Sequence, residues 1–116
     1  EIAVELLEQD GAEVEIAENG MEGIWKMKHA ADRWYDLILM DIQMPVMNGY
    51  DAARRIRELP RDDARQIPIL ALTADAFAED IQLARDAGMN GHLAKPLNMN
   101  ALRKEIQRQL ITAVHK

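Results

Sequence analysis

The chain has no cysteine among its 116 residues and few aromatic side chains. The absence of cysteine excludes disulfide bonds and thiolate metal sites. No apolar run approaches the length of a membrane span, and no charged leader followed by an apolar stretch opens the sequence. The net charge is −6 and no basic stripe stands out, which argues against direct binding of nucleic acid. We therefore expect a cytoplasmic domain that contacts neither nucleic acid nor a membrane.

The composition is typical of a folded, soluble domain. Hydrophobic residues make up 48% of the chain and charged residues 29%, which excludes a disordered chain. A length of 116 residues suits one domain with a single core, so we expect residues 1–116 to form one unit. The first residue is Glu1 and not Met, and the sequence starts within a helical pattern. We therefore expect an N-terminally incomplete piece of a longer protein.

Short apolar stretches and helical patterns alternate along the chain. Apolar periodicity predicts an edge strand at 12–17 and strands at 36–41, 67–74 and 91–96. Helical spacing predicts helices over 21–33, 49–59 and 76–87, with 60–66 as a polar connection. It also predicts a first helix that ends at Gly11 and a last helix that is capped by Asn98 and runs to about Leu110. This alternation is typical of an α/β fold with a doubly wound parallel sheet.

Three predicted strands end on polar side chains: Asp41, Thr73 and Lys95. The carboxyl ends of parallel strands meet at one edge of a sheet, so we expect a carboxylate, a hydroxyl and an ammonium group to lie together. A carboxylate can attack phosphorus and form an aspartyl phosphate, whose oxygens the other two groups would stabilise. Taken singly, the aspartate and the threonine can be helix caps and the lysine can be incidental. The occurrence of all three at the ends of strands favours a shared functional site.

The stretch YDLILMDIQMPVMNGYD, residues 35–51, resembles the receiver domain of two-component response regulators, a CheY-like family. The motif MDIQMPVMNG is most similar to the receivers of hybrid sensor histidine kinases. The resemblance extends from about residue 2 to residue 110. It implies a flavodoxin-like sheet of strand order 2-1-3-4-5, with the first strand missing from this sequence.

The resemblance implies a role for each residue of the site. Asp41 is the expected phosphoacceptor, Thr73 the switch hydroxyl and Lys95 the phosphate-binding lysine. The peptide bond between Lys95 and Pro96 is expected to be cis. His92 stands at the position of the family's switch aromatic, and its alternative role is a half-buried ring at the edge of the sheet.

A magnesium ion is the cofactor that the resemblance implies, with ligands from Asp41 and the backbone carbonyl of Gln43. The family adds two adjacent acidic residues at the end of the first strand, and this sequence lacks that pair. Mg²⁺ requires near-octahedral oxygen ligation, so we expect weak or no binding by this chain. Gln43 and Asp75 are expected to flank the phosphoryl group, although a helix N-cap is the preferred role for Asp75.

The missing strand would lie between 12–17 and 36–41. Losing roughly four buried aliphatic side chains forfeits on the order of 6–12 kcal/mol, while a whole domain is stable by only about 5–15 kcal/mol. We expect the 116 residues alone to fold poorly and to expose an apolar strand edge. Either the chain is the ordered part of a longer one, or a neighbouring chain donates the strand.

The leading functional hypothesis is a phosphoacceptor domain that takes a phosphoryl group from a phosphohistidine onto Asp41 and then switches its output surface. Its partner would be a histidine kinase or a histidine phosphotransfer domain, and a homodimer or strand exchange stays open. The domain would not be a stand-alone enzyme, although it could be part of a hybrid histidine kinase. One alternative is a truncated receiver that never carries phosphate and acts as a protein interaction module. Another is an aspartate-nucleophile phosphatase, which would need a second aspartate where Gln43 stands.

Overall fold

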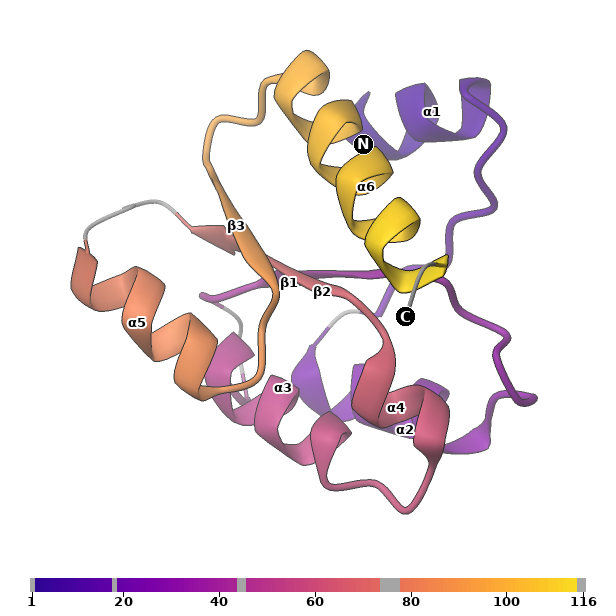
Figure 1. Cartoon of the computed structure of the whole chain (residues 1–116), viewed down its shortest axis with the longest axis vertical. Coiled ribbons are helices and arrows are strands. Elements are labelled where there is room, and N and C mark those ends of the chain that lie inside the picture. Colours follow the sequence, from indigo (N-terminus) through magenta and orange to yellow (C-terminus); the bar gives the residue numbers. More distant parts are fainter. Residues whose placement is uncertain (1, 18, 44–45, 74–77, 115–116) are drawn as a thin grey trace.

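The computed structural model describes residues 2–17, 19–43, 46–73 and 78–114 (Figure 1). The elements follow one another as α1 (Ile2–Gln9), α2 (Gly20–His29), β1 (Ile38–Asp41), α3 (Gly49–Arg57), α4 (Asp62–Gln66), β2 (Ile69–Thr73), α5 (Ala78–Asp86), β3 (Gly91–Ala94) and α6 (Met99–Val114). None of the described helices is long and apolar enough to cross a lipid bilayer.

The described strands form a parallel sheet in the order β1-β2-β3. Asp41 pairs with Leu72, and Thr73 pairs with Ala94, so the strands are in step at their carboxyl ends. Helices α1 and α6 cover one face of the sheet, and α2 to α5 cover the other (Figure 1). The predicted α/β architecture, doubly wound around a parallel sheet, is therefore confirmed.

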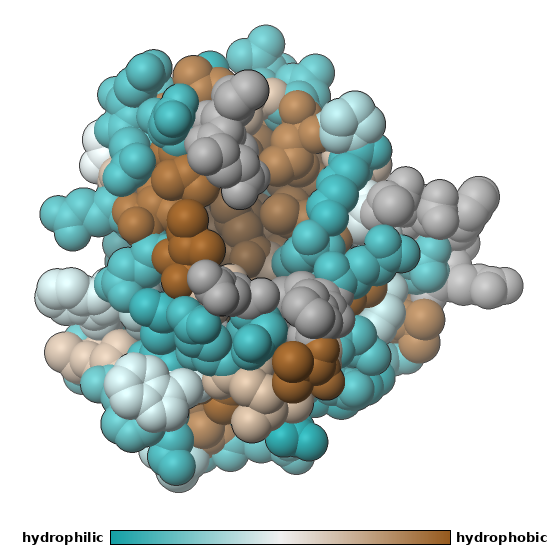
Figure 2. All heavy atoms as spheres, turned by 180° about the vertical axis from the view of Figure 1, so that it is seen from behind, coloured by the Kyte–Doolittle hydropathy of each residue, from teal (hydrophilic) through white to brown (hydrophobic). Residues whose placement is uncertain are grey.

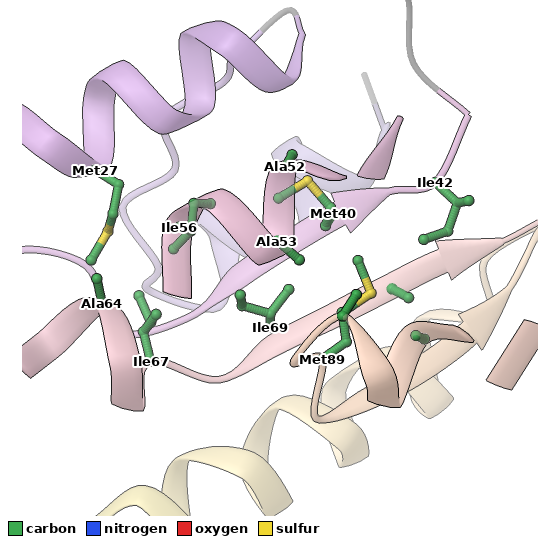
Figure 3. Close-up of a cluster of buried hydrophobic side chains, with 13 residues drawn as sticks. Met27, Met40, Ile42, Ala52, Ala53, Ile56, Ala64, Ile67, Ile69 and Met89 are labelled. Atoms are coloured by element: carbon green, nitrogen blue, oxygen red, sulfur yellow. The ribbon is translucent and has the colours of Figure 1, made fainter. Parts of the chain in front are cut away.

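The main core lies between the sheet and helix α3 (Figure 3). Ala52, Ala53 and Ile56 face inward at helical spacing and are almost completely buried, as is Ile69 of β2. On the opposite face of the sheet, the side chains of Leu70 and Leu102 are fully buried. Each such aliphatic side chain contributes about 1.5–3 kcal/mol when removed from water, so α3 and β2 are firmly held together.

The predicted helix signals at Gly11 and Asn98 are confirmed. Gly11 follows α1 with φ of 99°, and Gly88 follows α5 with φ of 93°, a conformation that glycine adopts without strain. The Asn98 side chain accepts hydrogen bonds from the backbone N–H groups of Asn100 (2.9 Å) and Ala101 (3.1 Å). Asn98 therefore caps α6, as predicted.

Residues 12–17 do not form the predicted edge strand, and this prediction was wrong. Within the described residues, β1 is hydrogen-bonded to β2 alone, and a cavity separates β1 from residues 12–17. A strand needs a neighbour for its backbone N–H and C=O groups. The burial of this segment does not alternate either, since Val14 is half-buried whereas Ile16, which would lie on the same face of a strand, is exposed. Among the described residues, no adjacent backbone completes a ladder.

The predicted polar connection 60–66 was also partly wrong, because it contains the short helix α4. The Arg61 guanidinium donates to the carbonyls of Met27 (2.8 Å) and Ala30 (2.7 Å) and forms a 2.8 Å ion pair with Asp63. Burial raises the pKa of Asp63, but hydrogen bonds from Arg61 and the Arg33 backbone outweigh it and hold that pKa below its usual value. These contacts join α4 to the end of α2.

Candidate functional site

The site begins at the last residue of β1. Met40 is buried in the core, and the next residue, Asp41, turns its carboxylate toward the carboxyl edge of the sheet. One carboxylate oxygen, Oδ1, accepts a hydrogen bond from the backbone N–H of Gln43 at 3.0 Å. The other, Oδ2, lies 2.6 Å from Nζ of Lys95. The carboxylate is thus held by two donors on a strand whose position the core fixes.

The start of helix α3 packs directly against the end of β1. The Gly49 N–H donates to the carbonyl of Ile42 at 2.9 Å, and a Cβ atom at Gly49 would lie 2.5 Å from the backbone oxygen of Asp41. Only glycine fits this close approach. In the sequence, Gly49 is only the first residue of the predicted helix 49–59, and its role in positioning Asp41 becomes visible once the two segments are in contact.

Thr73 and Lys95 lie at the same edge of the sheet as Asp41. Thr73 is the last residue of β2, one position beyond the partner of Asp41 in the strand register. The Lys95 N–H donates to the Thr73 carbonyl at 2.8 Å, which extends the β2–β3 pairing by one residue. The Lys95–Pro96 peptide bond is cis, the geometry that the resemblance implied. The structure thus brings Asp41 and Lys95 into contact and places Thr73 at the end of the strand between them.

His92 lies away from this carboxylate, at the outer edge of the sheet. It occupies β3 opposite Ala71 and lines a hollow of about 150 Å³ between α5 and α6, together with Arg85 and Glu105. Burial raises the pKa of Glu105. Hydrogen bonds from Gln109 and Arg108, together with the charge interaction with the nearby His92, outweigh the effect of burial, so the pKa of Glu105 lies below its usual value. His92 is therefore part of a half-buried, charged face formed by α5, β3 and α6.

Both oxygens of Asp41, the expected carboxylate ligand of a magnesium ion, already accept hydrogen bonds from Gln43 and Lys95. Over the described ranges, no group of three or more acidic or histidine side chains could hold a metal ion. Mg²⁺ is usually bound by one or two carboxylates with several waters and phosphate oxygens. These residues alone therefore do not fit a magnesium site. Asp75, the other residue expected near the phosphoryl group, lies outside the described residues.

Known proteins resemble this chain in both sequence and structure. The "Probable histidine kinase 2" of Oryza sativa subsp. indica is 38% identical over 95% of the chain. The receiver domain of the sensor histidine kinase PA1611 from Pseudomonas aeruginosa, solved with a magnesium ion in its active site cleft, is 35% identical with a TM-score of 0.78 over 94% of the chain. The chemotaxis protein CheY4 of Vibrio cholerae is 34% identical, with a TM-score of 0.85 over 94% of the chain.

The lengths of these proteins differ. The chain covers 83% of the PA1611 receiver and 87% of CheY4, but only 11% of the rice histidine kinase. The family of response regulator receiver domains matches residues 1–107, which include the whole of the site. This match favours a phosphorelay receiver over an interaction module that never carries phosphate. The fold, the convergence of Asp41 and Lys95 and this match agree: the chain belongs to the response regulator receiver domain family.

Proposed function

We propose that this domain is the phosphoacceptor of a two-component phosphorelay and that Asp41 carries the phosphoryl group. The observation that supports this most strongly is the 2.6 Å contact between the Asp41 carboxylate and the Lys95 ammonium at the carboxyl edge of the sheet. The Asp41 side chain is 35% exposed, so a phosphorylated partner can reach it. Ligands of open α/β sheets bind at this edge.

The reaction is a transfer between two nucleophiles. A carboxylate oxygen of Asp41 forms a bond to phosphorus, the bond between phosphorus and the imidazole nitrogen of a phosphohistidine breaks, and its electron pair stays on that nitrogen. The product is an acyl phosphate on Asp41. Lys95 stabilises the charge that gathers on the phosphoryl oxygens, because its ammonium already lies beside the carboxylate.

Phosphorylation would act on the rest of the domain through charge. The phosphoryl group carries about −1.5 to −2 charges in place of the single charge of the Asp41 carboxylate, so the negative charge beside Lys95 grows by about 0.5 to 1. Thr73 offers a hydroxyl donor to the phosphoryl oxygens, and its backbone is tied to that of Lys95. A movement of Thr73 and Lys95 toward the phosphoryl group would shift β3 and so the face on which His92 lies. The domain would then populate a second state of that face.

The partners follow from this chemistry. The donor would be a histidine kinase or a histidine phosphotransfer domain, and the chain would be one part of a longer cytoplasmic polypeptide. Dimerisation stays a hypothesis. We further propose that the 116-residue chain binds Mg²⁺ weakly or not at all, because the described residues hold no group of three or more acidic or histidine side chains that could bind a metal ion.

The test uses the full polypeptide that carries the domain, incubated with Mg²⁺ and a small acyl phosphate and analysed by intact mass. We expect the mass of one phosphoryl group to be gained, and the gain to be absent in Asp41→Asn. Asp51→Asn is the matched control, because Asp51 is an exposed aspartate on the neighbouring helix α3. No gain in the unaltered protein would support the interaction module, and steady release of free phosphate with turnover would support a phosphatase.

A further inference from the structure

Val46 follows Asp41 in the segment between β1 and α3, and its side chain is 79% exposed. That fraction is larger than that of any other exposed large hydrophobic residue in the described part of the chain. On the face seen from behind, the raised surface is mainly hydrophilic, and apolar side chains gather in a hollow near its centre (Figure 2). One exposed apolar side chain is ordinary in a protein, so the exposure of Val46 becomes informative only together with its backbone.

The backbone of Val46 is strained. Its φ is 73°, in the left-handed region, which a β-branched residue avoids because its Cβ approaches the neighbouring carbonyl oxygen. Glycine adopts this conformation without strain, and asparagine adopts it more readily than valine. A strained residue persists only where the surrounding structure enforces its conformation, and such residues concentrate at functional sites.

Contacts on both sides of Val46 enforce this turn. Met47 packs against the core, and a Cβ at Gly20 of α2 would lie 3.3 Å from the Met47 Cβ. The Gly49 N–H donates to the Ile42 carbonyl at 2.9 Å, which returns the chain to the end of β1. With Met47 turned inward, Val46 has its side chain in solvent. Folding therefore requires the turn but gains little from the valine side chain, and glycine or asparagine would form the turn with less strain.

Val46 lies beside the point where the phosphoryl group would arrive. Gly49 packs against the Asp41 backbone, and three residues of chain span at most about 11 Å, so Val46 lies within that distance of Gly49. A phosphohistidine must bring its phosphorus to within about 3–3.5 Å of an Asp41 oxygen. Even a transient interface covers up to about 600 Å² on each partner, which equals a disc of about 14 Å radius. A donor centred on Asp41 and Gly49 therefore covers Val46.

We propose that Val46 is a docking residue for the protein that donates the phosphoryl group, and that it packs against an apolar side chain next to the donor's phosphohistidine. The inference rests on the proposed transfer to Asp41. It explains why a valine stands where folding alone favours glycine or asparagine, because apolar area that the domain leaves in water is removed from water when the donor binds. The Val46 side chain has no group that can bind a phosphoryl oxygen, so it acts on donor binding and not on the chemical step.

The test compares two donors that contain the same phosphorus–nitrogen bond. One is a phosphorylated histidine phosphotransfer domain, chosen from a panel as the domain that phosphorylates the full polypeptide fastest. The other is phosphorylated imidazole, which has no protein surface. For Val46→Asn we expect the KM for the donor domain to rise about tenfold with kcat unchanged, because a contact present both before and during transfer is lost. The rate with phosphorylated imidazole should change by less than about twofold.

Two further variants separate docking from formation of the turn. Val46→Leu keeps an apolar side chain and should hold the KM for the donor domain within about threefold of its original value. Leu83→Asn removes an apolar side chain that is 44% exposed on α5, and it should leave that KM unchanged. Urea unfolding of Val46→Asn should show an equal or higher midpoint, because backbone strain is relieved.

Equal effects of Val46→Asn with the two donors would overturn the proposal, because the side chain would then act on Asp41 itself. An unchanged KM for the donor domain would overturn it as well, and so would a lower unfolding midpoint, which would mean that the side chain contributes to folding. In each of these cases, transfer from phosphorylated imidazole to Asp41 of the unaltered protein would still be seen. No phosphoryl gain from either donor in the unaltered protein would instead contradict the proposed function and the inference with it.

Discussion

The Asp41 carboxylate and the Lys95 ammonium lie 2.6 Å apart although they are 54 positions apart in the sequence. Two features hold the pair in place. The close approach of Gly49 fixes the end of β1, and the hydrogen bond from the Lys95 N–H to the Thr73 carbonyl fixes the end of β3. Because the two side chains are 35% and 38% exposed, their attraction adds only about 0–1 kcal/mol to stability. Their proximity therefore matters more for chemistry than for folding.

Removing the ammonium should lower phosphotransfer without unfolding the domain. For Lys95→Ala we expect the rate of phosphoryl gain at Asp41 to fall about 10²-fold, because a preorganised charge beside the transferred group is lost. Intact-mass measurements over time give the rate, and urea unfolding gives the stability. Lys104→Ala, at an exposed lysine of α6, is the control. Equal rates in the two variants would show that Lys95 has no part in the transfer.

A side chain at Gly49 should disturb both stability and the phosphoacceptor. The Cβ of Gly49→Ala would lie 2.5 Å from the Asp41 carbonyl oxygen, so α3 and β1 must separate, at a cost of about 1–3 kcal/mol. Gly23→Ala is the matched control, because the nearest atom to its Cβ, on Ala17, is 3.8 Å away. Since Gly23 lies within helix α2, that change should stabilise the domain by up to about 1 kcal/mol. Denaturant unfolding should show a lower free energy of unfolding for Gly49→Ala and a higher one for Gly23→Ala.

The Asp63 carboxylate should make the free energy of unfolding depend on pH under acidic conditions. Its pKa in the folded protein is lowered, below an unfolded value of about 3.9. The unfolded state therefore binds its proton first as the pH falls. The stabilisation is complete above the unfolded pKa and is lost as the pH drops through the folded pKa.

The Asp63→Asn variant tests this linkage. At pH 6 we expect it to be less stable than the unaltered protein by about 1–3 kcal/mol, because Arg61 loses its ionic partner. The difference should shrink as the pH is lowered from about 4 to 2. Asp62→Asn, at the exposed start of α4, is the control. A difference that stays constant with pH would mean that the charge of Asp63 is not what stabilises α4.

His92 should be required for the conformational change of α5 and α6 that follows phosphorylation, and not for the transfer of the phosphoryl group to Asp41. Its ring lines the hollow between α5 and α6, whereas Asp41 is bonded to Lys95 and Gln43 at the carboxyl edge of the sheet. For His92→Ala we expect unchanged phosphoryl gain at Asp41, and at least about twofold smaller phosphorylation-dependent NMR shift changes along α5 and α6. Loss of phosphoryl gain in this variant would instead place His92 in the transfer step.

The sequence predicted the parts of this fold that depend on local patterns. The end of the first helix at Gly11, the cap at Asn98 and the ends of β1 and β2 at Asp41 and Thr73 could be predicted from spacing and turn chemistry. Residues 12–17 could not be read correctly, because whether an alternating segment becomes a strand depends on a neighbour far away in the sequence.

Several contacts that shape the domain are long-range and carry no local signal. The Arg57 side chain donates to the Gly88 carbonyl (2.8 Å) and to the Ala64 carbonyl (3.0 Å), so it joins α3 to the end of α5 and to α4. In sequence it appears only as a basic residue near a helix end. Gly49 was visible only as the start of a predicted helix, and its contact with the Asp41 backbone depends on how α3 packs against the sheet.

The packing of α3 links the folding of the domain to the position of the nucleophile. In the described part of the chain, β1 is paired with β2 and its carboxyl end lies against Gly49 of α3. These two neighbours determine where the Asp41 carboxylate lies relative to Lys95. Changes that loosen them should therefore slow phosphotransfer while leaving every side chain that touches phosphate unaltered.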